Sequence, residues 1–418
     1  MSNIKIIHAR EILDSRGIPT VECQLWLDDG SFVHSSVPSG TSTSKMEAFE
    51  LRDNDPNRMA GKGVLTAVNN VNNIIGPQLV GQDPTDQTKI DQLMVDLDGT
   101  KNKSKLGANA ILAVSQVVAK AGALSQKMPL YRYIQQKYQL TQTLRIPTAI
   151  YGIINGGEHG ADNLDIQEFQ IIPASHIDFS TSLSIAVSLY QKLQEVLISK
   201  GAIHSVGMVG GFAPNLYNNT DAFEILIETI KATPYTFAQD VFFGVDVEAS
   251  AFYESGKYNL KDKSQPNTPD DMMAYYKTLR QQYHVFYIED PFEEDDWKSW
   301  KQLTSDIGDN TTIAADTLLS TNPDKIKKAI KEKACNAIII KPNQIGTISE
   351  TIAAIQMSKE AQMTTVCSHR SGETCDDFIA DFAVGTGVDY ARFGPPNRGE
   401  RVAKYNRFLQ IESQLMRS

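Results

Sequence analysis

Residues 337–341 read Ala-Ile-Ile-Ile-Lys, a short apolar run that stops at a charged residue. Similar runs occupy residues 149–154, 166–172, 241–247, 285–288, 312–315 and 364–368, and amphipathic segments separate most of them. Short buried strands that alternate with amphipathic helices are typical of βα units. The pattern predicts a parallel sheet that closes into an α/β barrel.

Polar residues stand where most of these predicted strands end. The series is Asp246, Glu289, Asp316, Lys341, His369 and Arg392, and its members are 43, 27, 25, 28 and 23 residues apart. After the first interval, the spacing is about one strand plus one helix. The carboxyl ends of barrel strands meet at one rim, and this rim holds the active site of barrel enzymes. We therefore expect the series to form a site, the alternative being unrelated loop charges.

The first third of the chain has a different character. Residues 18–37 alternate between apolar and polar around Asp28-Asp29-Gly30-Ser31, which predicts a β-hairpin. Helical periodicity follows at 63–75, 85–95 and 108–125. Pro129, the polar residues 135–143 and Pro147 interrupt this periodicity and indicate a linker. We predict an α+β domain at 1–139 and the barrel at 140–418.

The overall composition narrows the function classes. The 418 residues carry 40 Lys and Arg against 50 Asp and Glu, a net charge of -10, which disfavours nucleic acid and anionic membranes as partners. Residues 1–12 include Lys5, Arg10 and Glu11, so they lack the apolar core of a signal peptide or membrane span. The four cysteines show no metal-binding spacing. We expect a cytoplasmic protein.

The strand-end residues suggest specific chemistry. Asp246, Glu289 and Asp316 are hard oxygen ligands, which suit Mg²⁺ better than zinc or copper. A competing interpretation is that each carboxylate pairs with a nearby Lys or Arg. Lys341 would emerge beside the metal, where neighbouring positive charge lowers a lysine pKa and allows it to act as a general base. A purely structural lysine is the alternative.

Two glycine-rich segments do not indicate a nucleotide site. Residues 155–159 read Asn-Gly-Gly-Glu-His and residues 207–211 read Gly-Met-Val-Gly-Gly. Neither matches the G-x-G-x-x-G fingerprint or a P-loop.

Several longer motifs identify a family. They are Asp14-Ser15-Arg16-Gly17, Pro38-Ser39-Gly40-Thr41-Ser42-Thr43, Asn155-Gly156-Gly157-Glu158-His159, Glu289-Asp290-Pro291-Phe292, Lys341-Pro342-Asn343-Gln344 and Ser368-His369-Arg370-Ser371-Gly372. Through them the chain resembles the enolases, the phosphopyruvate hydratases, over essentially its whole length. The resemblance implies a modified eight-stranded α/β (TIM-like) barrel with an N-terminal α+β capping domain. It also implies a homodimer or a higher homo-oligomer.

The resemblance further implies a reaction, the reversible dehydration of 2-phosphoglycerate to phosphoenolpyruvate through an ene-diolate. Enolase-superfamily sites combine a Lys or His base with one or two Mg²⁺ ions. Carried over to this chain, the family roles assign the base, the metal ligands and the substrate contacts. Lys341 would be the base, with Glu168 and His159 as further catalytic groups; Asp246, Glu289 and Asp316 would bind the first Mg²⁺ and Ser42 the second; His369, Arg370, Ser371 and Arg392 would bind substrate.

The chain departs from the family pattern at several positions. Val209 stands where the family has the Glu that protonates the departing hydroxyl, and Arg392 stands where it has a Lys. Ala251 and Ala315 are smaller departures. The leading hypothesis is a divergent, Mg²⁺-dependent lyase acting on a phosphorylated or phosphonylated hydroxy acid. The alternative is a non-catalytic paralogue that serves as a metal-stabilised binding or surface protein.

Overall fold

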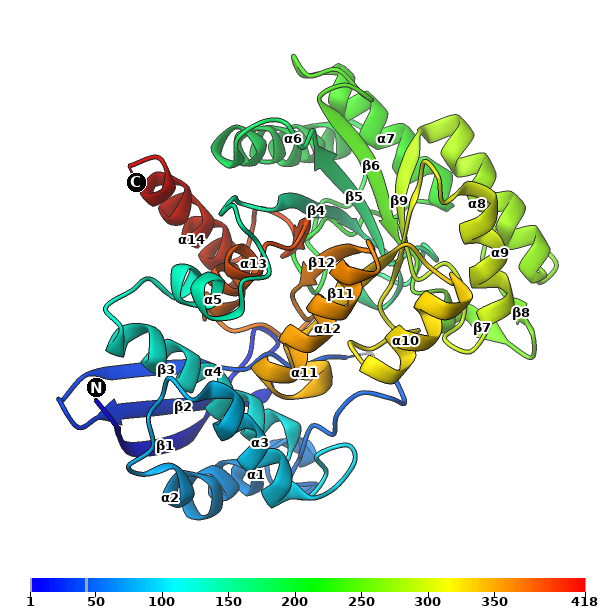
Figure 1. The fold of residues 1–418 in the computed structure, drawn as a ribbon. Helices are drawn as coiled ribbons and strands as arrows, with labels where there is room; N and C mark the ends of the chain where they lie inside the picture. Colours follow the sequence, from blue (N-terminus) through cyan, green and yellow to red (C-terminus); the bar gives the residue numbers. More distant parts are fainter. Residues whose placement is uncertain (1, 42–43, 418) are drawn as a thin grey trace.

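The computed structural model describes residues 2–41 and 44–417, and its N-terminal part is a three-stranded sheet covered by helices (Figure 1). Strands β1 (Ile4–Leu13), β2 (Pro19–Leu27) and β3 (Phe32–Ser36) pair antiparallel in that order. The predicted hairpin at 18–37 is β2 and β3. Strand β1 was not predicted, because its exposed and buried residues alternate irregularly.

Helix α4 (Ala108–Ser125) forms the centre of this N-terminal part and packs on β2 and β3. It has the predicted bounds. By length and composition alone α4 is apolar enough to cross a membrane, but 83% of it is buried inside the protein, as in a core helix. The predicted segments at 63–75 and 85–95 correspond to consecutive turns α1 (Leu65–Asn70), η2 (Val71–Ile75) and α2 (Gly76–Leu79), and to α3 (Gln87–Asp98).

The segment predicted as a linker contains a helix, α5 (Leu130–Tyr138). The predicted loss of helical periodicity is therefore wrong for residues 135–138; the helix ends only at Gln139, which has the positive φ of 53° typical of a C-terminal cap. Helix α5 packs on α13 (Phe378–Thr386), and the backbone NH of Tyr131 donates to Asp381 Oδ1 at 3.2 Å. The division at residues 139 and 140 stays a prediction.

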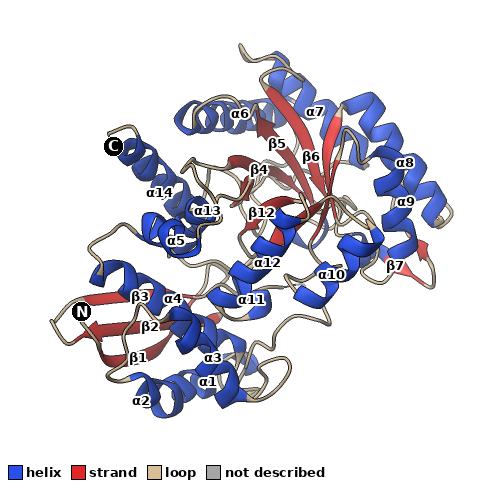
Figure 2. Ribbon diagram, in the orientation of Figure 1, coloured by secondary structure: helices blue, strands red, loops and turns tan. Residues whose placement is uncertain are grey.

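In the described part of the chain, eight strands close into a barrel (Figure 2), as expected. In spatial order around the barrel they are β10 (Thr312–Ala315), β11 (Ala337–Ile340), β12 (Thr364–Ser368), β13 (Tyr390–Arg392), β4 (Thr148–Asn155), β5 (Glu168–Pro173), β6 (Val241–Asp246) and β9 (Val285–Glu289).

The sheet is not wholly parallel, which corrects the prediction. Strand β5 runs antiparallel to both β4 and β6, while the other neighbours are parallel. Residues 156–167 link β4 to β5 through only a short 3-10 turn, and a parallel connection needs a longer crossover, usually a helix. The first residue of β5, Glu168, therefore lies at the rim where the other strands end.

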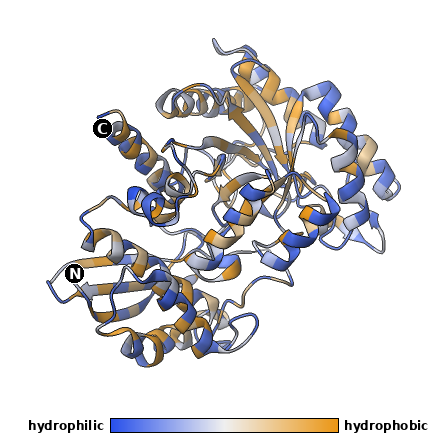
Figure 3. Cartoon of the chain, viewed as in Figure 1, coloured by the Kyte–Doolittle hydropathy of each residue, from blue (hydrophilic) through white to orange (hydrophobic). Residues whose placement is uncertain are grey.

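Helices cover the outside of the barrel, and many residues of its strands are hydrophobic (Figure 3). The helices that follow the strands are α6 (Phe179–Ser199), α7 (Asn219–Lys231), α8 (Pro269–Tyr283), α9 (Trp297–Ile307), α10 (Pro323–Glu332), α12 (Ile348–Glu360), α13 and α14 (Gly399–Leu415). Between β6 and α8 lies the small hairpin of β7 (Tyr253–Glu254) and β8 (Lys257–Tyr258), and the short helix α11 (Pro342–Ile345) follows β11. A separate apolar cluster inside the barrel includes Ile150, Ile172, Tyr287, Ile339 and Val366.

Candidate functional site

The predicted strand-end residues meet at one rim of the barrel around a small cavity. Its volume is about 30 Å³, and its lining is Thr41, Glu47, His159, Gln167, Glu168, Asp246, Glu248, Asp316, Thr317, Lys341, His369, Arg370, Ser371 and Arg392. Of the predicted site residues that the structure describes, only Glu289 is not in this lining. Glu289 is completely buried and contacts Arg392, while Ser42 lies outside the described residues.

Three carboxylates form a row across neighbouring strands. Glu168 on β5 is the register partner of Asp246 on β6, and Asp246 is the register partner of Glu289 on β9. Glu289 lies on the same face of β9 as Tyr287, two residues earlier, and the Tyr287 hydroxyl donates to Glu289 Oε2 at 2.9 Å. Strand register therefore fixes the spacing of these acids.

The guanidinium of Arg392 is the cation that this row holds. Arg392 Nη1 lies 2.6 Å from Asp246 Oδ2 and 3.2 Å from Glu168 Oε2, and Nη2 lies 2.8 Å from Glu289 Oε1. All of these groups are buried. Arg392 was predicted to contact substrate; in this structure it contacts carboxylates predicted to hold a metal instead. The competing interpretation, ion pairs on these acids, therefore describes the arrangement seen here.

Lys341 pairs with the remaining predicted metal ligand. Its Nζ donates to Asp316 Oδ2, and Gln344 Nε2 donates to Asp316 Oδ1 at 2.8 Å. Burial alone would raise the pKa of Asp316, but the Lys341 ammonium outweighs burial and lowers that pKa. Lys341 emerges directly after β11, as predicted, and its neighbour Asp316 follows β10 by one residue.

Glu248 is a carboxylate of the cavity that was not predicted. It lies two residues beyond Asp246, and 8% of its surface is exposed. Burial, together with the charges of Asp290, Asp246 and Asp316, raises the pKa of Glu248 well above its usual value. The signal that could have found it was its place just after a strand end, in Asp246-Val247-Glu248.

Whether this site suits a divalent cation can be judged from its donors and its charges. Five carboxylates lie at this rim, Glu168, Asp246, Glu248, Glu289 and Asp316, and two cations, Arg392 and Lys341, contact all of them except Glu248. Asp246 Oδ1 is buried and accepts no hydrogen bond among the described residues. Hard oxygen donors with excess negative charge fit Mg²⁺. In the arrangement seen here, however, Asp246, Glu289 and Asp316 do not form a compact group: within the described ranges, only Glu293, Glu294 and Asp295 place their ligand atoms within 4.8 Å of one another.

Arg370 and Ser371, both predicted to bind substrate, contact Glu47 and Thr41. Arg370 Nη1 lies 2.8 Å from Glu47 Oε2, and the backbone NH of Thr41 donates to Ser371 Oγ at 3.0 Å. Arg401 is fully buried beneath the pair and donates to the carbonyl oxygens of Arg370 and Ser371 at 2.7 and 2.6 Å. Arg401 thus holds the pair from below, while Thr41 and Glu47 contact its side chains.

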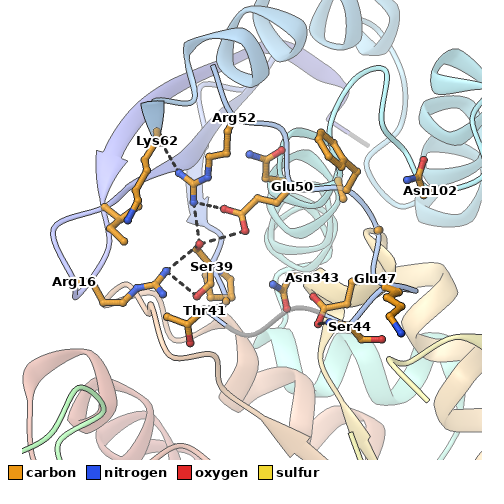
Figure 4. A pocket seen from close by; sticks show the side chains of 18 residues that line it. Arg16, Ser39, Thr41, Ser44, Glu47, Glu50, Arg52, Lys62, Asn102 and Asn343 are labelled. Atoms are coloured by element: carbon orange, nitrogen blue, oxygen red, sulfur yellow. Dashed lines mark hydrogen bonds and ion pairs between the residues drawn. The ribbon is translucent and has the colours of Figure 1, made fainter. Parts of the chain in front are cut away.

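A larger cavity of about 570 Å³ lies next to these residues, and Thr41, Ser44 and Glu47 are part of its lining (Figure 4). At one end Ser39 is fixed by two arginines, since Arg16 Nη2 and Arg52 Nη2 donate to Ser39 Oγ at 3.0 and 2.9 Å. Ser39 Oγ also contacts Glu50 Oε2 at 3.2 Å. These hydrogen bonds hold Ser39, the residue immediately before Gly40, in place.

The two histidines of the site differ in their surroundings. His369 Nδ1 lies 2.8 Å from Arg401 Nη1, and burial followed by the charges of Arg401, Arg392 and Lys341 lowers the pKa of His369 well below its usual value. The imidazole is therefore neutral at pH 7. His159 Nδ1 lies 3.3 Å from Glu168 Oε1, so these two residues, both predicted to be catalytic, are in contact.

Val209 is completely buried and is not part of the cavity lining. Its loop lies against His159, because the backbone NH of Met208 donates to the His159 carbonyl at 2.8 Å. Of the smaller departures, Ala251 lies in the 3-10 turn after β6 and Ala315 is the buried last residue of β10.

Comparison with known families agrees with this architecture. Residues 4–134 match the family described as Enolase, N-terminal domain, and residues 143–418 match Enolase, C-terminal TIM barrel domain. The chain belongs to the enolase family. The fold predicted from the resemblance to enolases, an N-terminal α+β domain with an eight-stranded barrel, is confirmed. Enolase-family membership supports a lyase, and the family is generally Mg²⁺-dependent.

Proposed function

We propose that this chain is an enolase-type hydro-lyase. It would abstract the α-proton of 2-phosphoglycerate, or of a closely related phosphorylated or phosphonylated hydroxy acid, and form an ene-diolate. The observation that carries the proposal is that Lys341, the carboxylates Asp246 and Asp316, and the pair Arg370 and Ser371 line one cavity. This combination can hold a phosphorylated acid beside a base.

Lys341 is the base in this proposal. Its amine reaches the cavity from the end of β11 and pairs with Asp316. To take a proton from the substrate, Nζ must separate from Asp316. Asp246, Glu289 and Asp316 are the residues that would hold Mg²⁺, which when bound supplies positive charge for the oxygens of an ene-diolate.

Arg370 and Ser371 would bind the phosphate or phosphonate group. A guanidinium suits a tetrahedral oxyanion because it offers paired N–H donors. In this structure the cavity is small, about 30 Å³, and Arg370 and Ser371 already contact Glu47 and Thr41 there. Binding therefore requires Glu47 and Thr41 to release Arg370 and Ser371.

The departure of the hydroxyl is the step that the chain supports least. Val209 has no proton to donate, and loss of a general acid costs about 10²- to 10⁴-fold in rate. Glu168 does not replace it well, because Arg392 and His159 outweigh the effect of burial and lower the pKa of Glu168. A carboxyl in this state is ionised at pH 7. We therefore propose fast proton abstraction and slow dehydration.

The test follows both halves of the reaction with 2-phosphoglycerate and Mg²⁺ in deuterated solvent. The unaltered chain should exchange the α-proton, seen by NMR, with little phosphoenolpyruvate formed. Val209→Glu should raise dehydration, and Lys341→Ala should abolish exchange. Exchange that persists in Lys341→Ala, or dehydration by the unaltered chain at ordinary enolase rates, would contradict the proposal.

A second candidate, a non-catalytic paralogue that binds metal or ligand, is favoured by one observation. Arg392 and Lys341 already neutralise the carboxylates that the reaction needs. This candidate predicts thermal stabilisation by Mg²⁺ or 2-phosphoglycerate without any α-proton exchange. Exchange in the unaltered chain rejects it.

We also propose a cytoplasmic homodimer or higher homo-oligomer, on the strength of the family membership alone. Light scattering at several concentrations tests the assembly.

A further inference from the structure

Glu248 occupies an unusual backbone position at the rim of the barrel. Its φ and ψ are 47° and 51°, in the left-handed region that residues other than glycine rarely adopt. The neighbouring backbone holds it there, because Val247 NH donates to the Glu289 carbonyl at 2.9 Å and Ala249 NH donates to the Asp290 carbonyl at 3.1 Å. Such strained positions concentrate at functional sites, where the surrounding structure maintains them.

The side chain of Glu248 has no counter-charge of its own. It is more than nine-tenths buried and lines the cavity, yet among residues 2–41 and 44–417 it forms no hydrogen bond and no ion pair. Buried carboxylates that stay ionised are normally paired or coordinate a metal, because burying an isolated charge is costly. Among the described residues, Glu248 lacks the partner that would hold it in the ionised form.

The other carboxylates of the site are already engaged. Arg392 holds Asp246 and Glu289, and Lys341 and Gln344 hold both oxygens of Asp316. Behind them, Asp290 accepts hydrogen bonds from the backbone NH groups of Asp316 and Thr317 at 2.9 and 3.0 Å. Among the described carboxylates that line the cavity, Glu248 is the only one that is buried from bulk solvent and pairs with none of these groups.

We propose that Glu248 is a direct ligand of the divalent cation in this cavity. It adds an oxygen donor to those of Asp246, Glu289 and Asp316, because Arg392 already occupies one oxygen of Asp246 and one of Glu289. The proposal rests on the Mg²⁺-dependence included in the proposed function. It concerns binding of the ion, which can be measured without turnover.

The experiment titrates Mn²⁺ into the full chain and measures free Mn²⁺ by electron paramagnetic resonance. Loss of a ligating group should weaken affinity at least about 10-fold, so Glu248→Gln should raise the dissociation constant by this factor. Glu254→Gln, an exposed carboxylate on β7 in the same connection, is the matched control and should leave it unchanged. Thermal unfolding in a chelator verifies that both variants fold.

A second variant tests the part assigned to Arg392. Arg392→Lys should let Mn²⁺ reach Asp246 and Glu289, because a lysine cannot bridge both acids as the guanidinium does. It should bind Mn²⁺ more tightly than the unaltered chain and should restore binding in the double variant with Glu248→Gln. If Glu248→Gln fails to fold, Glu248→Asp takes its place: the shorter carboxylate should bind Mn²⁺ more weakly than the unaltered chain does, and equal affinity would contradict the proposal.

Two results would overturn the proposal: equal Mn²⁺ affinity in Glu248→Gln and the unaltered chain, or no Mn²⁺ binding by the unaltered chain at millimolar concentration. The proposed function fails separately. If Mn²⁺ binding depends on Glu248 as expected but no α-proton exchange is found, the metal ligand stands and the reaction does not.

Discussion

At the scale of single residues, the site is defined by how each buried charge is compensated. Arg401 illustrates this. Its guanidinium is completely buried and donates hydrogen bonds to the carbonyl oxygens of Arg370 and Ser371 and to His369 Nδ1. Since the guanidinium can only donate, His369 must accept and stay neutral. The protonation state of His369 is thus coupled to the support of the predicted phosphate-binding pair.

This coupling predicts a pH dependence of stability. The pKa of His369 is lowered on folding and is about 6.5 when unfolded, so the unfolded chain takes up more protons as pH falls below about 6.5. Stability is fully present above this pH and declines by up to about 1.4 kcal/mol per pH unit below it. His369→Asn, whose amide oxygen can still accept from Arg401, should remove this contribution.

The measurement is urea unfolding at pH 7.5 and pH 5.5. The unaltered chain should lose more unfolding free energy between these values than His369→Asn does, by about 1 kcal/mol. Equal losses in the two proteins would show that His369 is not the group responsible.

At the scale of elements, the loop that follows β3 packs very closely against the barrel at Gly40. A Cβ added at Gly40 would lie 1.9 Å from Arg370 Nη2 and 2.7 Å from its Cζ, so any side chain there must displace the buried guanidinium. Gly40→Ala should therefore push the Arg370 guanidinium out of its place in the cavity lining, where it would bind the phosphate, and weaken binding of 2-phosphoglycerate about 10-fold, roughly 1.4 kcal/mol. Calorimetric titration measures this.

Gly399→Ala at the start of α14 is the control for that substitution, because an added Cβ there meets no atom within 4 Å. It should bind like the unaltered chain. Unchanged affinity in Gly40→Ala would mean that the position of Arg370 does not govern ligand binding.

Element patterns also show how much the sequence could predict. The apolar runs ending at Glu289, Lys341 and His369 located strands and rim correctly, because buried parallel strands are nearly continuous apolar stretches. They could not reveal that β5 runs antiparallel, since direction depends on the connection rather than on the strand itself. Nor could they show that the Arg392 guanidinium contacts Asp246, because its reach across the barrel depends on packing in three dimensions.

At the scale of the whole molecule, the N-terminal part and the barrel share buried polar contacts. Lys120 Nζ pairs with Asp376 at 2.9 Å, Ser349 Oγ donates to Asp91 at 2.6 Å, and the hydroxyls of Ser36 and Thr374 lie 2.7 Å apart. Separation of the parts would leave these groups without partners. We expect the two parts to unfold together.

The three tryptophans allow a test, because Trp26 lies on β2 whereas Trp297 and Trp300 lie on α9. In Trp26→Phe, fluorescence reports the barrel; in the double variant Trp297→Phe and Trp300→Phe, it reports the N-terminal part. Within each variant, fluorescence and far-ultraviolet circular dichroism should give the same urea midpoint. Midpoints that differ would indicate independent unfolding.

The inverted strand β5 makes the rim sensitive to small changes in chain length. Glu168, Gln170 and Ile172 point to one side of the strand, and Phe169 and Ile171 point to the other. A single inserted or deleted residue that slipped β5 against β6 by one position would turn the phenyl ring of Phe169 toward Arg392 and send Glu168 out among the helices. Variation in length between residues 156 and 167 is therefore constrained to changes that preserve this pairing.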